Sequence, residues 1–85
     1  MNIAEEALQM VSQNEDGYGR PEESWEEIAT IASILCRKKL EALDCVKVLK
    51  AVKLVRESYK HKRDNIVDEI GYCLVEERVK DGSGR

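Results

Sequence analysis

Apolar residues recur every three or four positions in four segments of the chain, and no segment alternates long enough between polar and apolar residues to predict a strand. The predicted helices cover residues 2–13, 22–38, 43–59 and 63–79. We therefore expect an all-α fold, a bundle of four short helices. Residues 1–80 are expected to form a single helical domain, followed by a disordered tail over 81–85.

Turn-forming residues separate these segments. Asn2 is suited to cap the first helix, because its side chain can accept a hydrogen bond from a free backbone N–H. The stretch 14–21 holds two glycines and the only proline of the chain, and predicts a loop. Pro21 is suited to begin the second helix, and Gly82 to end the fourth.

The third predicted helix is apolar around most of its circumference. Its apolar side chains are Val46, Val48, Leu49, Val52, Leu54 and Val55. A helix of this kind is normally surrounded by other helices. Since 85 residues provide too few neighbours, we expect a homodimer or a higher homo-oligomer.

The charge distribution is asymmetric. The chain has a net charge of −3, but residues 1–44 carry ten acids and four bases (−6), whereas residues 45–85 carry seven acids and ten bases (+3). The net charge argues against a nucleic-acid partner. The basic second half predicts either an anion site or two layers of opposite charge that attract each other.

The cysteines and the N-terminus bear on the compartment. Three widely spaced cysteines and a single histidine favour buried free thiols in a reducing cytoplasm over a disulfide framework or a zinc site. The N-terminus lacks the features of a signal peptide, and no apolar run is long enough to span a membrane. We expect a cytoplasmic protein.

Two aspartates on the fourth predicted helix form the first candidate site. Asp64 and Asp68 are four residues apart, so they lie on the same face. Mg²⁺ commonly binds one or two carboxylates together with phosphate oxygens, which suits this pair. The alternative is structural: Asp64 caps the helix and Asp68 is simply exposed.

Other polar residues extend this hypothesis. Lys53, Arg56 and Lys60 follow one strip of the third helix and could hold a polyphosphate, although a solvated face is the alternative. In the second helix three acids are further candidate metal ligands, unless they only complement the helix dipole: Glu23, Glu26 and Glu27. His61, in the turn before the fourth helix, is either structural or part of the phosphate site. No residue is assigned a catalytic role.

Two stretches, DGYGRPEESWEEIATI and KLVRESYKHKRDNIVDEIGY, resemble a family of small phage and prophage proteins of uncharacterised function. The resemblance covers about residues 14–75. The matching positions are Tyr18, Gly19, Pro21, Glu22, Trp25, Ile28, Ala29, Lys53, Arg56, His61, Asp64, Asp68, Gly71 and Tyr72. The chain departs from the pattern at Ser24, where the family has Asn before the aromatic residue.

This pattern is also similar to that of all-α nucleotide pyrophosphohydrolases of the MazG-like and dimeric dUTPase-like kind, although DNIVD stands where those enzymes have ExxD. The resemblance implies Mg²⁺ bound by the five acids named above, phosphate bound by Lys53, Arg56 and His61, and a contribution from Tyr18 and Tyr72. The function expected is that of a Mg²⁺-dependent nucleotide pyrophosphohydrolase of a phage, active in the bacterial cytoplasm. The alternatives are a non-catalytic helical module that binds a nucleotide or a host protein, and a purely structural oligomer.

Overall fold

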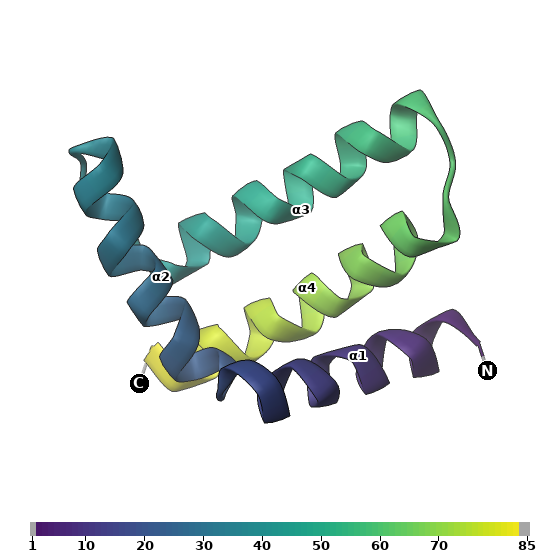
Figure 1. Ribbon diagram of the computed structural model, residues 1–85, viewed down its shortest axis with the longest axis horizontal. Coiled ribbons are helices and arrows are strands. Elements are labelled where there is room, and N and C mark those ends of the chain that lie inside the picture. The colour runs from purple at the N-terminus through teal and green to yellow at the C-terminus, as the bar shows by residue number, and fades with distance from the viewer. Residues whose placement is uncertain (1, 84–85) are drawn as a thin grey trace.

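The computed structural model describes residues 2–83, and the side chains of residues 2–81. Over this range the chain forms four α-helices and no strand, so the predicted all-α class is confirmed (Figure 1). The helices are α1 (Ile3–Tyr18), α2 (Pro21–Cys36), α3 (Ala42–Tyr59) and α4 (Arg63–Ser83).

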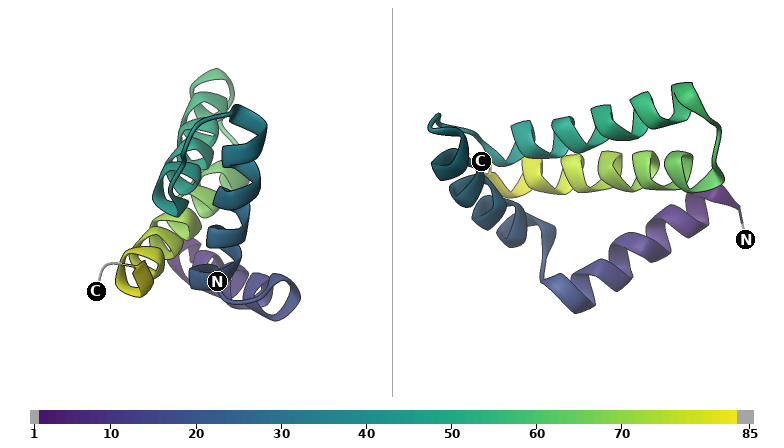
Figure 2. Two further views of the ribbon diagram at one scale, coloured as in Figure 1. Left: turned by 90° about the vertical axis from the view of Figure 1, so that its left-hand side faces the viewer. Right: turned by 45° about the horizontal axis from the view of Figure 1, so that its top comes forward.

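The longest helix, α4, lies at the centre of the fold. It packs against α3 on one side and α1 on the other, and α2 crosses the end of this layer where it contacts both α3 and α4 (Figures 1 and 2). Helices α3 and α4 run antiparallel, as their short connector requires. The other end of the layer, around the α3–α4 connector, is not covered by α2.

Several boundaries differ from the sequence-based prediction. Gly17 is helical, so α1 extends to Tyr18, and the expected loop shrinks to Gly19 and Arg20. Gly19 adopts a φ of 88°, which glycine accepts without steric cost. Helix α4 continues through residues 81–83 of the expected disordered tail, including Gly82, because one glycine near a helix end costs only about 1 kcal/mol. The rest of that tail, 84–85, lies outside the described residues.

Local interactions explain where the helices begin. Asn2 caps α1 as predicted, because its side chain accepts a hydrogen bond from the Glu5 backbone N–H at 2.8 Å while the Glu5 carboxylate accepts one from the Asn2 backbone. Pro21 is the first residue of α2. The connector before α3 is held by Ser33, whose hydroxyl accepts a hydrogen bond from the Leu40 backbone N–H at 2.9 Å.

The hydrophobic core is small and lies where α2 crosses α3 and α4. Its members are mostly valine and alanine: Val11, Trp25, Ala29, Ala42, Val46, Val75 and Val79. The apolar residues of α2 form a broad face that is only partly buried, because Ile31 and Leu35 are 61% and 77% exposed. The chain therefore buries its small apolar residues and leaves several of its largest ones exposed.

Gly71 marks the close approach of α1 to α4. A Cβ atom at this position would lie 2.7 Å from Cε of Met10, which is the end of a flexible side chain. Since Met10 can move, and alanine favours a helix more than glycine does, we expect Gly71→Ala to change the free energy of unfolding by less than about 1 kcal/mol. Gly71→Leu should cost about 1–3 kcal/mol through overpacking. Urea denaturation measures the free energy of unfolding of both variants, and an equal loss of stability in the two would contradict the prediction.

None of the helices in the described part of the chain is long and apolar enough to cross a membrane.

Candidate functional site

Two ion pairs join α3 to α4. Lys53 Nζ lies 2.7 Å from Asp68 Oδ2, and Lys50 Nζ lies 2.8 Å from Glu76 Oε1. The Glu76 pKa is lowered, chiefly by this hydrogen bond from Lys50. Arg56 lies about as far before the α3–α4 connector as Asp68 lies after it, but the structure places Lys53 against Asp68 instead. Within the described residues, Arg56 therefore has no acid in ion-pair contact.

A pocket of about 530 Å³ lies beside the Lys53–Asp68 pair, at the α3–α4 connector. Its polar lining residues are Lys53, Arg56, Lys60, Lys62, Asp64, Asn65 and Asp68. Four bases therefore face two acids, and within the described residues only one of these bases, Lys53, has an acid in ion-pair contact. The pocket, called here the basic pocket, carries an excess of positive charge in a chain whose net charge is −3.

Asp64 does not cap α4, because the helix begins at Arg63 and Asp64 lies exposed in its first turn. His61, predicted to contact phosphate, is not among the residues that line the basic pocket. Its Nδ1 contacts the Glu57 carboxylate, whose other oxygen accepts hydrogen bonds from the Lys62 backbone and from the buried Asn65 side chain. The pKa of Glu57 is lowered, first by the His61 contact and then by the Lys62 N–H. This cluster fixes the connector that carries the pocket.

A second pocket, of about 460 Å³, lies where α1, α2 and α4 meet. Three of its lining residues are aromatic: Tyr18, Trp25 and Tyr72. The rings of Trp25 and Tyr72 meet edge to face, with centroids 6.3 Å apart, whereas Tyr18 is 79% exposed at the rim. This aromatic pocket also contains polar groups from Asn14, Ser24 and Glu27.

The two pockets follow one another along α4. Asp64, Asp68, Tyr72 and Val75 are spaced by four, four and three residues, so they form one row on the helix surface. The first two line the basic pocket and the last two the aromatic pocket. From Asp68 to Tyr72 the helix rises about 6 Å. One elongated ligand could therefore contact both pockets.

The acids of α2 lie apart from Asp64 and Asp68. The first turn of α2 meets α4 at Arg78, which is ten residues, or about 15 Å along the helix, beyond Asp68. Glu23, Glu26 and Glu27 are all exposed, and Glu27 lines the aromatic pocket. Among the side chains of residues 2–81, no group of three or more His, Cys, Asp and Glu residues could hold a metal ion. The five acids are thus not gathered within a single chain.

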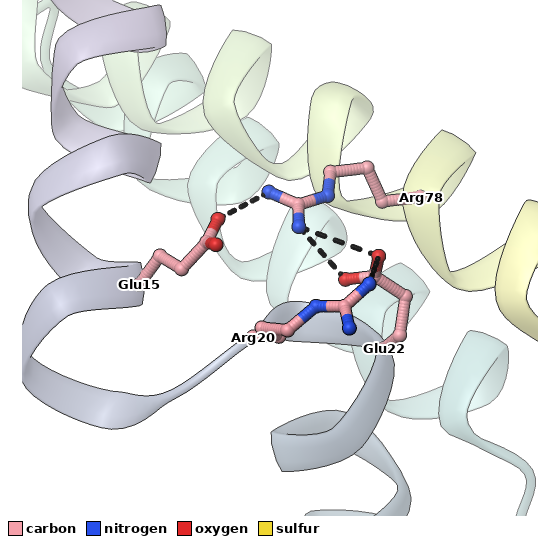
Figure 3. A network of polar contacts seen from close by, with 4 residues as sticks. All are labelled: Glu15, Arg20, Glu22 and Arg78. Carbon is pink, nitrogen blue, oxygen red and sulfur yellow. Dashed lines mark hydrogen bonds and ion pairs between the residues drawn. The ribbon is translucent and has the colours of Figure 1, made fainter.

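Arg78 connects three helices, and no local pattern in the sequence signals this. Its Nη1 lies 2.6 Å from Glu15 Oε2 at the end of α1, and its Nη2 lies 3.0 Å from Glu22 Oε1 at the start of α2 (Figure 3). Arg20 approaches the same carboxylate, 3.1 Å from Oε2. The pKa of Glu22 is lowered, first by a hydrogen bond from its own backbone N–H and then by the two arginines. This network holds the tight turn beside the aromatic pocket.

Comparisons with known proteins give one match. No curated protein and no solved structure shows significant similarity to the chain. One family model matches residues 2–80, which include both pockets and the Arg78 network. The chain therefore belongs to the family described as a domain of unknown function (DUF6378).

Proposed function

We propose that this protein binds a nucleoside phosphate along α4, with the phosphates in the basic pocket and the base in the aromatic pocket. The observation that carries the proposal is the excess of bases around Asp64 and Asp68. Phosphate oxygens would balance the charges of Arg56, Lys60 and Lys62, and the arginine can contact two oxygens at once.

The aromatic pocket suits a nucleobase for two reasons. Aromatic side chains stack on the faces of bases, which contributes about 1–3 kcal/mol per base in proteins that bind single strands. Asn14 and Glu27 supply donor and acceptor groups for the edge of a base. Because Tyr72 follows Asp68 by one helical turn, the phosphates and the base of one ligand would lie in adjoining pockets.

Mg²⁺ belongs to the same proposal. Asp64 and Asp68 are too few for a cage made by the protein alone, but Mg²⁺ is commonly held by one or two carboxylates and by the phosphates of its ligand. The resemblance to phage proteins and to MazG-like and dimeric dUTPase-like enzymes makes nucleoside triphosphates the first ligands to test. Pyrophosphate release is then the reaction to assay, and it separates hydrolysis from capture without turnover.

Trp25 provides a direct assay, since it is the only tryptophan and lines the aromatic pocket. We expect nucleoside triphosphates to change its fluorescence and to raise the melting temperature of the protein. Arg56→Ala should weaken binding about tenfold, the effect of a lost charged hydrogen bond. Lys47→Ala is the matched control, because Lys47 is an exposed base of α3 outside the basic pocket. A melting temperature unchanged by nucleotide and Mg²⁺ together would rule out the proposed function.

Asp68→Asn separates the role of the carboxylate from that of the bases. It removes the partner of Lys53, so we expect a loss of about 1–2 kcal/mol in the free energy of unfolding. It also leaves one more uncompensated positive charge, so binding of tripolyphosphate without Mg²⁺ should become tighter, and stabilisation by Mg²⁺ with nucleotide should be lost. Calorimetric titration and melting curves measure these effects. Weaker tripolyphosphate binding by Asp68→Asn would contradict the assignment of the pocket to an anion.

A further inference from the structure

We infer that the exposed apolar face of α2 is covered by α2 of a second copy of this chain, with the two helices antiparallel. The face, called here the α2 face, consists of Ile28, Ile31 and Leu35, which are 42%, 61% and 77% exposed. They are spaced by three and four residues and therefore form one stripe. Ile34, 71% exposed, lies beside this stripe.

The α2 face continues onto α3. Val48 and Val55, seven residues apart on the surface of α3, are 62% and 56% exposed. A depression between the two helices is lined mostly by apolar residues of both, Ile28 and Val48 among them. Single exposed apolar residues are normal, but a continuous apolar surface of this kind on two helices marks an interface.

The charges at the two ends of α2 indicate what covers the face. The first half of the helix carries the exposed acids Glu23, Glu26 and Glu27. Immediately after the helix come three exposed bases, Arg37, Lys38 and Lys39. Along the helix axis the stripe of isoleucine and leucine lies between these two groups. Glu23 and Glu27, four residues apart, form a row that flanks the stripe, whereas Glu26 lies on the opposite side of the helix.

The acids at the start of α2 and the bases after its end can pair with those of a second copy only if the two helices are antiparallel. A two-fold axis near the middle of α2 sets the acids of each copy against the bases of the other, and each pairing occurs twice. The helix dipoles are then opposed as well, which favours the same orientation. A parallel arrangement would place acid against acid and base against base.

This inference does not depend on the proposed function, although Val55, which extends the surface on α3, also lines the basic pocket. It also differs from the expectation drawn from the sequence, where the circumference of the third helix suggested an oligomer. In the structure α2 contributes the most exposed aliphatic residues, and α3 only extends their surface. Because Ile28 and Ile31 also line the aromatic pocket, the second copy would lie beside that pocket.

The test is the mass of the protein in solution, measured by light scattering after size-exclusion chromatography and by sedimentation equilibrium. We expect the wild-type protein to be a dimer at micromolar concentration. Ile31→Glu with Leu35→Glu should raise its dissociation constant by at least about 30-fold. Both positions are exposed in the single chain, so circular dichroism should show an intact helical fold. Leu54→Glu is the matched control, because Leu54 is 51% exposed but lies on another face of α3.

A charge exchange tests the orientation. Glu23→Lys with Glu27→Lys should weaken the dimer, because the new lysines face Arg37 and Lys38 of the second copy. Adding Arg37→Glu and Lys38→Glu should restore it. A monomeric wild-type protein, or a dimer that is unaffected by the glutamates at positions 31 and 35, would overturn the inference. A dimer that ignores the lysine exchange would overturn the antiparallel arrangement.

Discussion

Replacing Trp25 with alanine is expected to lower the free energy of unfolding by about 3–5 kcal/mol, as for other buried aromatic residues. Trp25 is only 9% exposed and belongs to the core where α2 crosses α3 and α4, with Tyr72 at its edge. A chain of 85 residues has a small core, and its total stability is of similar size to this loss. We therefore expect Trp25→Ala to be largely unfolded at 37 °C.

Two further variants make this expectation specific. Trp25→Phe keeps an aromatic ring in the core and should retain the fold with a smaller loss of stability. Leu8→Ala removes a smaller apolar side chain that is 61% exposed on α1, and should cost less than about 1 kcal/mol. Circular dichroism and urea denaturation measure all three. If Trp25→Ala and Leu8→Ala cost the same, the core does not lie where α2 crosses the layer.

Arg78→Met should cost about 2 kcal/mol, between the values for exposed and for buried ion pairs, because the Arg78 side chain is 33% and the Glu22 side chain 20% exposed. For a domain of this size the melting temperature should fall by roughly 10 °C. The substitution removes the contacts that join α4 to both Glu15 and Glu22. Arg20→Met is the matched control: Arg20 also contacts Glu22 but is 61% exposed, so its loss should cost less than about 1 kcal/mol.

The same network makes stability depend on pH. The pKa of Glu22 is lowered from its ordinary value of 4.5 in the folded protein. Its contribution to stability is therefore complete above the ordinary pKa, and is lost as the pH falls through the lowered one. Arg78→Met removes one of the two arginines that lower the Glu22 pKa. When the pH is lowered from neutral to below the ordinary pKa, the free energy of unfolding should therefore decrease less for the variant than for the wild-type protein. Acid denaturation measures this difference, and an equal loss of stability in the two proteins would contradict the prediction.

Several features of the molecule could be predicted from local sequence alone. Apolar spacing, the Asn2 cap and Pro21 predict four helices, because each depends on residues within one or two turns of one another. The short connector also predicts the antiparallel pairing of α3 and α4, which the structure confirms. Opposite charges on these two helices predict that they meet across the pair, and Lys53 and Asp68 do so.

Other features depended on which helices pack together. The second helix has an apolar face too broad for one neighbour, and only the crossing with α3 and α4 decides that Trp25 and Ala29 are buried while Ile31 and Leu35 are exposed. For the same reason Lys53 and not Arg56 contacts Asp68, since a difference of about one helical turn in register decides which base reaches this carboxylate.

In the candidate sites too, some features could be predicted from local sequence and others depended on packing. Local sequence predicts that Lys53, Arg56, Asp64 and Asp68 lie near one another, because α3 and α4 are adjacent in the chain and their connector is short, and all four line the basic pocket. It could not place the acids of α2, since their distance from Asp68 depends on where a separate helix crosses the layer. Nor could it identify Arg78, whose partners Glu15 and Glu22 are 63 and 56 residues away in sequence. Local sequence thus determined the helices and their adjacent pairs, whereas contacts between distant segments, which depend on packing over the whole chain, were decided only by the tertiary structure.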